Sequence, residues 1–231
     1  MAAPLLIESQ WPIVDRTKIQ LFSLNTPNGI KVPLALEELQ IPYEAHTVNI
    51  GKGDQFTDAF KSISPNSKIP AIVDLDGPGG KPFALMESGA ILIYLAERAG
   101  RLLPTDPAQR FKCLQWLFFQ VGHIGPMFGQ FGHFFKYARD KCDHPYPLER
   151  YTNEAKRLLG VLETQLSDQE YLIGDYTIAD IASVPWVNGL STGYGAGDVL
   201  PLSGFPHVKA WVERIVQRPA YQIAKDVTKL P

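Results

Sequence analysis

The chain has 231 residues, of which 45% are hydrophobic and 20% charged, an ordinary composition for a globular protein of one large or two modest domains. Its formal net charge of −2 argues against a protein that binds nucleic acid through bulk phosphate contacts. The two cysteines are too few for a disulfide framework and lack the spacing of metal ligands, so we expect no metal and a reducing, cytoplasmic compartment.

Residues 1–16 carry no periodic pattern, and we expect them to form an N-terminal extension, to which the sequence assigns no role. Met1-Ala2-Ala3-Pro4 lacks the basic start of a secretory signal, and the apolar patch that follows it is too short for one. The compact part of the protein is therefore expected to begin at residue 17.

Residues 17–100 alternate between strand patterns and helix patterns. In chain order we predict a strand at 18–23, a helix at 29–39, a strand at 43–50, a helix at 56–63, strands at 71–74 and 82–86, and a helix at 87–99 that ends at Gly100. Pro33 falls near the first turn of its helix, where a missing N–H costs least. The first two strands need a crossover and the last two form a hairpin, which predicts a thioredoxin-like α/β domain.

Beyond residue 100 the strand pattern ends. We interpret 101–107 as a linker and 108–231 as an all-helical C-terminal domain, with helices at 108–121, 148–165, 178–190 and 207–217. The stretch 113–135 has no charged side chain, but four glycines and Pro126 interrupt it, which favours a buried helix and a site-lining turn over a membrane span. Thr177 and Asp180 have the spacing of a capping box, whose role is structural.

Thr26 and Asn28 lie where the first predicted strand turns into its helix. The N–H groups and the positive dipole end of a helix start favour an anion, and a thiolate held there has a lowered pKa. The simpler alternative is that Asn28 caps the helix and Thr26 belongs to a turn. Cys113 is predicted to be buried and inert and Cys142 to lie in an exposed loop, so any reacting sulfur would come from the ligand.

Two further segments indicate a peptide-like ligand. Ile69-Pro70 precedes a strand, and we predict a cis bond here, because it would turn the backbone groups of Ile69 toward an extended peptide. Glu87 and Ser88 open a helix, where the hydroxyl and backbone N–H groups can hold a carboxylate and Glu87 can accept from an ammonium. An ordinary N-terminal capping arrangement would explain the same pair.

Taken together, six segments resemble the cytosolic glutathione transferases, and the Nu class in particular. They are FSLNTPNG at 22–29, GKGDQF at 51–56, SPNSKIPA at 64–71, ESGAI at 87–91, QWLF at 115–118 and GHF at 132–134. The resemblance covers about residues 17–220 and extends to the globular part of the yeast nitrogen-regulator prion protein. It implies the glutathione transferase fold, which is a thioredoxin-like domain followed by an all-α domain.

The resemblance also implies which residues bind glutathione. Thr26 and Asn28 would contact the reactive sulfur, Gln55 the glycyl end, Ile69 the cysteinyl backbone, and Glu87 with Ser88 the γ-glutamyl group. Lys68 and Pro70 also belong to the implied glutathione-binding residues, and Arg150 resembles an arginine that reaches across a dimer. The implied assembly is a homodimer that binds one or two glutathione molecules, or their disulfide, in each site. Neither nucleic acid nor a membrane is an implied partner.

The function implied by the resemblance is a disulfide-bond oxidoreductase that uses glutathione to reduce small disulfides and has weak transferase activity. A bound glutathione thiolate would attack the disulfide, and a second glutathione would resolve the mixed disulfide. One alternative is a transferase that conjugates glutathione to electrophilic xenobiotics. Another is a glutathione-binding regulatory protein, although such a protein usually carries a long polar extension.

Overall fold

The computed structural model describes residues 5–230 and divides the chain into two compact units. One unit contains the residues up to Arg101 together with those from Pro219 onward, and the other contains Leu102–Arg218. Residues 1–4 of the predicted extension and residue 231 of the predicted helical domain lie outside the described residues. The structure thus groups the last segment of the chain with the first unit, where the sequence placed it in the helical domain.

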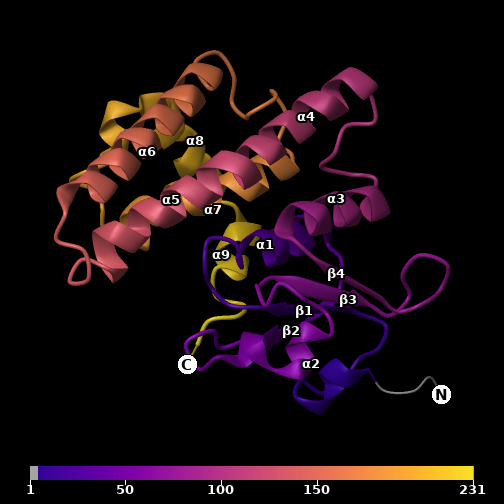
Figure 1. Cartoon of the computed structure of the whole chain (residues 1–231). Coiled ribbons are helices and arrows are strands. Elements are labelled where there is room, and N and C mark those ends of the chain that lie inside the picture. The colour runs from indigo at the N-terminus through magenta and orange to yellow at the C-terminus, as the bar shows by residue number, and fades with distance from the viewer. Residues whose placement is uncertain (1–4, 231) are drawn as a thin grey trace. The chain divides into compact units, whose positions relative to one another are not determined.

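The first unit is built around a four-stranded sheet with helices on both of its faces. Its elements are β1 (Ile19–Ser23), α1 (Lys31–Leu39), β2 (Tyr43–Thr47), α2 (Asp58–Lys61), β3 (Ala71–Asp74), β4 (Phe83–Met86), α3 (Ser88–Ala99) and, from the end of the chain, α9 (Pro219–Ala224). Figure 1 shows α1 and α3 on one face of the sheet and α2 on the other. The predicted thioredoxin-like fold is confirmed.

The strand order β2-β1-β3-β4 brings three loops to one end of the sheet. β1 is parallel to β2 and antiparallel to β3, and β3 is antiparallel to β4. Ala71, at the start of β3, pairs with Phe22 near the end of β1 and with Met86 at the end of β4. The turn after β1, the segment before β3 and the segment after β4 therefore meet at the same edge.

Two predicted elements of this unit are shorter in the structure. β2 ends at Thr47 rather than at residue 50, because Asn49 begins a turn in which its carbonyl accepts from Lys52 N at 3.0 Å. A short 3₁₀ turn (Asp54–Phe56) follows, and α2 covers only Asp58–Lys61 of the predicted helix 56–63. The chain between β2 and β3 is thus mostly turns, which place Gln55 in a loop.

The N-terminal extension packs onto the sheet. Ile7 lies in a 3₁₀ turn (Leu6–Ser9), is fully buried and belongs to one apolar cluster with Phe22 and Phe60. Trp11 packs its ring edge-on against the same two phenylalanines, with centroid distances of 6.0 and 6.1 Å. The described part of the extension therefore completes the core beneath α2.

The extension also contacts β2, which is an edge strand of the sheet. The indole Nε1 of Trp11 donates to the carbonyl of Thr47 at 3.0 Å. Near the other end of the strand, the Glu44 carboxylate accepts the backbone N–H groups of Val14 and Asp15 at 3.1 and 2.9 Å. Burial is the largest single influence on the pKa of Glu44 and raises it, but the hydrogen bonds oppose burial, and the pKa is lowered overall.

The C-terminal segment of the chain returns to the first unit. α9 packs against α1, and the backbone N–H of Asn25 donates to the carbonyl of Thr228 at 3.3 Å. Tyr221 and Ala224 of α9 are buried. This packing explains why the structure groups residues from Pro219 onward with the sheet: their apolar side chains cover α1.

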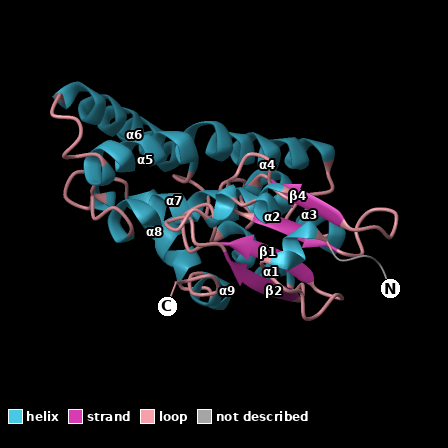
Figure 2. Ribbon diagram, turned by 60° about the horizontal axis from the view of Figure 1, so that its bottom comes forward, coloured by secondary structure: helices cyan, strands magenta, loops and turns pink. Residues whose placement is uncertain are grey.

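The second unit is built of helices, as Figure 2 shows. They are α4 (Pro107–Phe119), α5 (Gly125–Gly132), α6 (Pro145–Gln165), α7 (Ile178–Thr192) and α8 (Pro206–Val216), and a 3₁₀ turn (Leu202–Gly204) precedes α8. Four of these match predicted helices to within three residues at each end. Within residues 5–230, we find no helix that combines the length and the apolar character needed to cross a membrane.

The segment between α4 and α6 differs from the prediction. Instead of one helix followed by a turn, α4 runs through a π-helical turn (Gln120–Ile124) into α5, and a second π-helical turn (His133–Tyr137) follows. The glycines there are places of close approach rather than helix ends. A Cβ on Gly132 would lie 2.2 Å from the ring of Tyr194, and one on Gly125 would lie 2.9 Å from the side-chain nitrogen of Gln120 in the preceding π-helical turn.

The predicted capping box at the start of α7 is present. The Thr177 side chain accepts from the backbone N–H of Asp180, and the Asp180 carboxylate accepts from the backbone N–H of Thr177. Asp180 is completely buried. Its carboxylate also accepts from Leu172 N at 3.0 Å and from Trp211 Nε1 at 2.9 Å. Since all of these partners are donors, the carboxylate ties three segments of the helical unit together, which is the structural role that the sequence predicted.

Candidate functional site

The turn after β1 is held tightly against the end of that strand. Gly29 N donates to Thr26 Oγ1 at 3.1 Å, and Ile30 N donates to the Thr26 carbonyl at 2.9 Å, so Thr26 opens the first turn that leads into α1. A Cβ on Gly29 would lie 1.7 Å from the carbonyl oxygen of Leu24, which no side chain could tolerate. The Thr26 hydroxyl oxygen is the acceptor in this contact, so the hydroxyl hydrogen can be donated to another group.

A hollow of about 270 Å³ lies at the edge of the sheet where the three loops meet. It is lined by Asn28, Ser64, Lys68, Ile69, Pro70, Met86, Glu87 and Ser88. Six of these residues were predicted as site residues from the sequence. Thr26 belongs to the same turn as Asn28 but is not among the lining residues.

The segment before β3 forms one wall of the hollow. The peptide bond between Ile69 and Pro70 is cis, as predicted. The conformation of the preceding loop is fixed by Ser64, which is fully buried and donates its hydroxyl to the Lys68 carbonyl at 2.8 Å. Ser64 was missed as a lining residue because a serine in a Ser-Pro-Asn-Ser turn reads as exposed turn chemistry.

Glu87 and Ser88, which follow β4, form a second part of the wall. Glu87 precedes α3 with a φ of 70° and a ψ of 110°, a strained conformation for a residue with a side chain, and such strain gathers at ligand sites. Its side chain does not cap the helix. The first N–H groups of α3 therefore remain as donors beside the hollow, as the sequence predicted for a carboxylate-binding helix start.

Lys31 lies behind this wall and was not identified from the sequence. It is in the first turn of α1, is only 1% exposed, and its Nζ donates to Ser88 Oγ at 3.2 Å. Burial lowers the pKa of Lys31 to about 7, and the charge of Glu87 opposes that effect. The sequence contained a signal, because the apolar Leu34 and Ala35 follow Lys31 by three and four residues, a spacing that puts all three on one face of a helix.

Gln55 belongs to the same unit but is not among the residues that line the hollow. Its side chain is 9% exposed, and its Nε2 donates to the Ile50 carbonyl at 3.3 Å. Within the described part of the chain, Gln55 Oε1 is buried and has no hydrogen-bond partner. Such an orphaned acceptor suits a donor supplied by a ligand.

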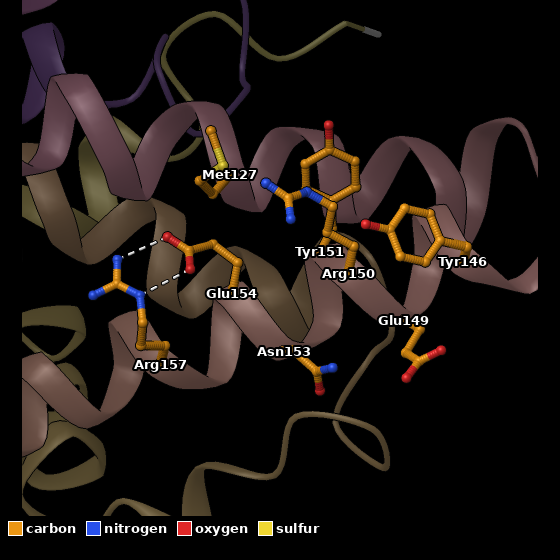
Figure 3. A pocket seen from close by; sticks show the side chains of 8 residues that line it. All are labelled: Met127, Tyr146, Glu149, Arg150, Tyr151, Asn153, Glu154 and Arg157. Carbon is orange, nitrogen blue, oxygen red and sulfur yellow. Dashed lines mark hydrogen bonds and ion pairs between the residues drawn. The ribbon is translucent and has the colours of Figure 1, made fainter.

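Arg150 lies in the helical unit, in a second hollow of about 470 Å³ shown in Figure 3. The lining comes from α5 and α6: Met127, Tyr146, Glu149, Arg150, Tyr151, Asn153, Glu154 and Arg157. Arg157 donates to both carboxylate oxygens of Glu154, at 2.7 and 2.8 Å, and this hydrogen bonding lowers the pKa of Glu154. Arg150 is therefore not among the residues that line the hollow of the first unit.

Neither cysteine has the setting of a nucleophile. Cys113 is fully buried in α4, and burial raises the pKa of its thiol. Cys142 lies in the loop before α6, where its Sγ contacts the His144 carbonyl at 3.8 Å, and both thiols are free. Within residues 5–230, no three His, Cys, Asp or Glu side chains gather closely enough to hold a metal ion.

Both halves of the chain match models of one protein family. Residues 26–98 match the N-terminal domain of glutathione S-transferase, and residues 125–219 match its C-terminal domain. The disulfide-bond oxidoreductase YfcG of Escherichia coli (strain K12) is 48% identical over 204 residues, which cover 87% of this chain and 92% of YfcG. YghU of the same organism, also named a disulfide-bond oxidoreductase, is 42% identical over 225 residues, 94% of this chain and 77% of YghU.

Solved structures agree with this assignment. A glutathione transferase family member from Pseudomonas fluorescens pf-5, with two glutathione molecules bound, is 50% identical and superposes with a TM-score of 0.95 over 97% of this chain and all of that one. One from Pseudomonas putida, with one glutathione disulfide per subunit, is 48% identical with a TM-score of 0.94 over 96% and 97% of the two chains.

The predicted likeness to the yeast nitrogen regulator is also confirmed. Ure2p in complex with glutathione is 32% identical, with a TM-score of 0.82 over 92% of this chain and all of that one. The match thus extends over both units and over the turn, the cis-proline segment and the helix start that form the hollow. This chain belongs to the glutathione transferase family.

Proposed function

We propose that this chain reduces small disulfides with glutathione, the activity class that the names of YfcG and YghU give to those relatives. The observation that carries the proposal is the hollow of the first unit: it is lined by residues suited to a charged peptide, and none of its eight lining residues is a cysteine. The reacting sulfur would then belong to glutathione.

In this proposal the two parts of the wall hold the tripeptide. The backbone of Ile69 pairs with the cysteinyl residue in the manner of an added strand, with Lys68 and Pro70 on either side. The Ser88 hydroxyl and the N–H groups at the start of α3 donate to the γ-glutamyl carboxylate, and Glu87 accepts from the ammonium of the same group. Gln55, whose Oε1 is a buried acceptor, receives an N–H from the glycyl end.

Thr26 and Asn28 hold the glutathione sulfur as a thiolate. The Thr26 hydroxyl accepts from Gly29 N, so its hydrogen can be donated to an anion at the helix start. The thiolate attacks one sulfur of the disulfide, a glutathione–substrate disulfide forms, and the other half leaves as a thiolate. A second glutathione thiolate then attacks the glutathione sulfur of that mixed disulfide, which yields glutathione disulfide and the second substrate thiolate.

The structures of the Pseudomonas relatives, with two glutathione molecules or one glutathione disulfide per subunit, support a site in this chain large enough for both partners of the second step. We further propose that the chain is a homodimer in which Arg150 serves the glutathione site of the partner subunit. The two free thiols support a reducing, cytoplasmic location. Sedimentation of the purified chain tests the dimer.

The reaction is tested by comparing two assays on the same preparation. We expect strong glutathione-dependent reduction of 2-hydroxyethyl disulfide and weak conjugation of chlorodinitrobenzene. Ser88→Ala should raise the KM for glutathione in both assays. If conjugation is fast and disulfide reduction is absent, the chain is a conjugating transferase. If the chain binds glutathione but catalyses neither reaction, a regulatory role replaces the proposal.

A variant with both Cys113→Ser and Cys142→Ser tests the origin of the sulfur. Because neither thiol lines the hollow, the variant should retain most of the parent's reductase turnover. Its fold is checked by circular dichroism and its thermal midpoint. A folded variant without turnover would show that a protein thiol takes part and that glutathione alone does not carry the chemistry.

A further inference from the structure

We propose that Lys31 is a positioning residue for glutathione: it holds the Ser88 hydroxyl so that this hydroxyl donates to the γ-glutamyl carboxylate. The inference rests on the proposed function, and it assigns a role to a buried charge that does not itself line the hollow.

The geometry of the hydrogen bond fixes the direction of the hydroxyl. When Lys31 is protonated, its ammonium has only donors, so in the contact of 3.2 Å between Lys31 Nζ and Ser88 Oγ the serine oxygen accepts. The hydroxyl hydrogen must then point away from Lys31. Ser88 lines the hollow and is the first residue of α3, so a carboxylate placed at this helix start can receive that hydrogen together with the backbone N–H groups.

Charge supports the same arrangement. Glu87 is the charged group that acts on Lys31, and Lys68 is the other charged residue that lines the hollow. The other charged residues of α1 are Glu37 and Glu38, and those of α3 are Glu97 and Arg98; each pair lies near the C-terminal end of its helix. α9, which packs on α1, has no charged residue. Glu37 accepts from the Tyr43 hydroxyl at 2.6 Å, and Arg98 pairs with Asp74.

The γ-glutamyl group brings both a carboxylate and an ammonium, so a ligand that carries the carboxylate alone adds a second negative charge beside a buried amine. Because burial has brought the pKa of Lys31 down to about 7, an anion on the other side of Ser88 raises that pKa again. Binding of such a ligand should then be accompanied by uptake of a proton near neutral pH.

The test uses three ligands that differ only in the γ-glutamyl head group. They are S-methylglutathione, its analogue without the carboxylate (4-aminobutyryl-S-methylcysteinylglycine) and its analogue without the ammonium (glutaryl-S-methylcysteinylglycine). S-methylation removes the titration of the thiol from the measurement. Each ligand is titrated into the full chain and into Lys31→Met by calorimetry, and Lys209→Met, an exposed lysine on α8, serves as the matched control.

We expect Lys31→Met to weaken S-methylglutathione and the glutaryl analogue by about tenfold or more, the effect of losing one charge-assisted hydrogen bond. The 4-aminobutyryl analogue should bind the parent and Lys31→Met equally, because it has no carboxylate to lose. Lys209→Met should match the parent throughout. In a Ser88→Ala background the effect of Lys31→Met on S-methylglutathione should shrink, since the two residues act in series.

Proton uptake gives an independent readout. Calorimetry of the glutaryl analogue in buffers of different ionisation enthalpy at about pH 7.5 should show uptake with the parent that Lys31→Met abolishes. If Lys31→Met weakens all three ligands equally, or none of them, Lys31 does not position the carboxylate contact and the inference fails. If Lys31→Met does not fold, Lys31→Gln replaces it under the same criteria. If the parent binds none of the ligands, the proposed function itself is wrong.

Discussion

Removing the two donors at the start of α1 should change the pH dependence of the reaction more than the affinity for glutathione. The double variant Thr26→Ala, Asn28→Ala deletes the hydroxyl that opens the helix and the amide that lines the hollow. A hydrogen bond to a charged acceptor contributes about 1.5–3 kcal/mol, so losing one donor should raise the pKa of the bound thiol by roughly one or two units. At neutral pH less of the glutathione would then be thiolate.

The structure also predicts a separate effect on stability, which has to be distinguished from the effect on rate. Thr26 Oγ1 accepts from Gly29 N at 3.1 Å, and losing such a cap costs about 1 kcal/mol. Thr26→Ser keeps both the cap and the donor, so it should match the parent in stability and in pH profile. Thr26→Ala should lose both, and Asn28→Ala separates the contribution of the amide.

The assay is the rate of 2-hydroxyethyl disulfide reduction at saturating glutathione from about pH 6 to about pH 10. The variant's deficit should be largest at neutral pH and should shrink at high pH, where thiolate is abundant without help. Gln55, Ile69 and Ser88 remain, so the affinity for S-methylglutathione should fall less than the rate. If the profiles of variant and parent superimpose after scaling, neither residue tunes the thiolate, and their role is structural.

Three further predictions concern stability. Gly29→Ala should lower the free energy of unfolding by about 3 kcal/mol or prevent folding, because the new Cβ would lie 1.7 Å from the Leu24 carbonyl; urea titration measures this, and a change below about 1 kcal/mol would contradict the geometry of the turn. Trp11→Phe should lower the free energy of unfolding by about 1 kcal/mol, because the hydrogen bond to Thr47 is lost. Trp11→Ala should lower it by roughly 3 kcal/mol, because the edge-on contacts of the ring are lost as well. Thermal unfolding measures both, and midpoints equal to that of the parent would show that the extension adds nothing to the core. Lys31 has a folded-state pKa of about 7, below its unfolded value of about 10.4, so the unfolded chain binds more protons between these two pH values. The free energy of unfolding of the parent should therefore rise with pH across that window, by an amount on the order of 4 kcal/mol relative to Lys31→Met. Parallel plots of unfolding free energy against pH for the two proteins would refute this prediction.

The order of the sheet explains why most of the hollow could be predicted from the sequence. The succession β-α-β-α-β-β-α requires three loops to meet at one edge of the sheet. These loops contain Asn28 after β1, Ile69 before β3 and Glu87 after β4. The chemistry of each loop could be read locally from its turn residues, its proline and its helix start. Position and chemistry then agreed without knowledge of any tertiary contact.

Other features depended on contacts between residues far apart in the chain. Lys31 is connected to the hollow only through its partner Ser88, 57 residues later. Gly125 and Gly132 were interpreted as interruptions of a helix, whereas the helical path continues past both, and Gly132 lets the distant Tyr194 approach closely. The C-terminal segment lacks a strong pattern of its own, and only its packing against α1 reveals which unit it completes.

The contacts of the N-terminal extension with β2 protect an edge of the sheet against association between folded molecules. An exposed edge strand offers unpaired backbone groups to any other extended chain, and native proteins cover or blunt such edges. Trp11 contacts the end of β2 and Glu44 fastens the chain near its beginning, so the extension occupies the approach that a foreign strand would take. A shortened form that starts after residue 16 would present this edge uncovered, and its self-association should grow with protein concentration even if the hollow is intact.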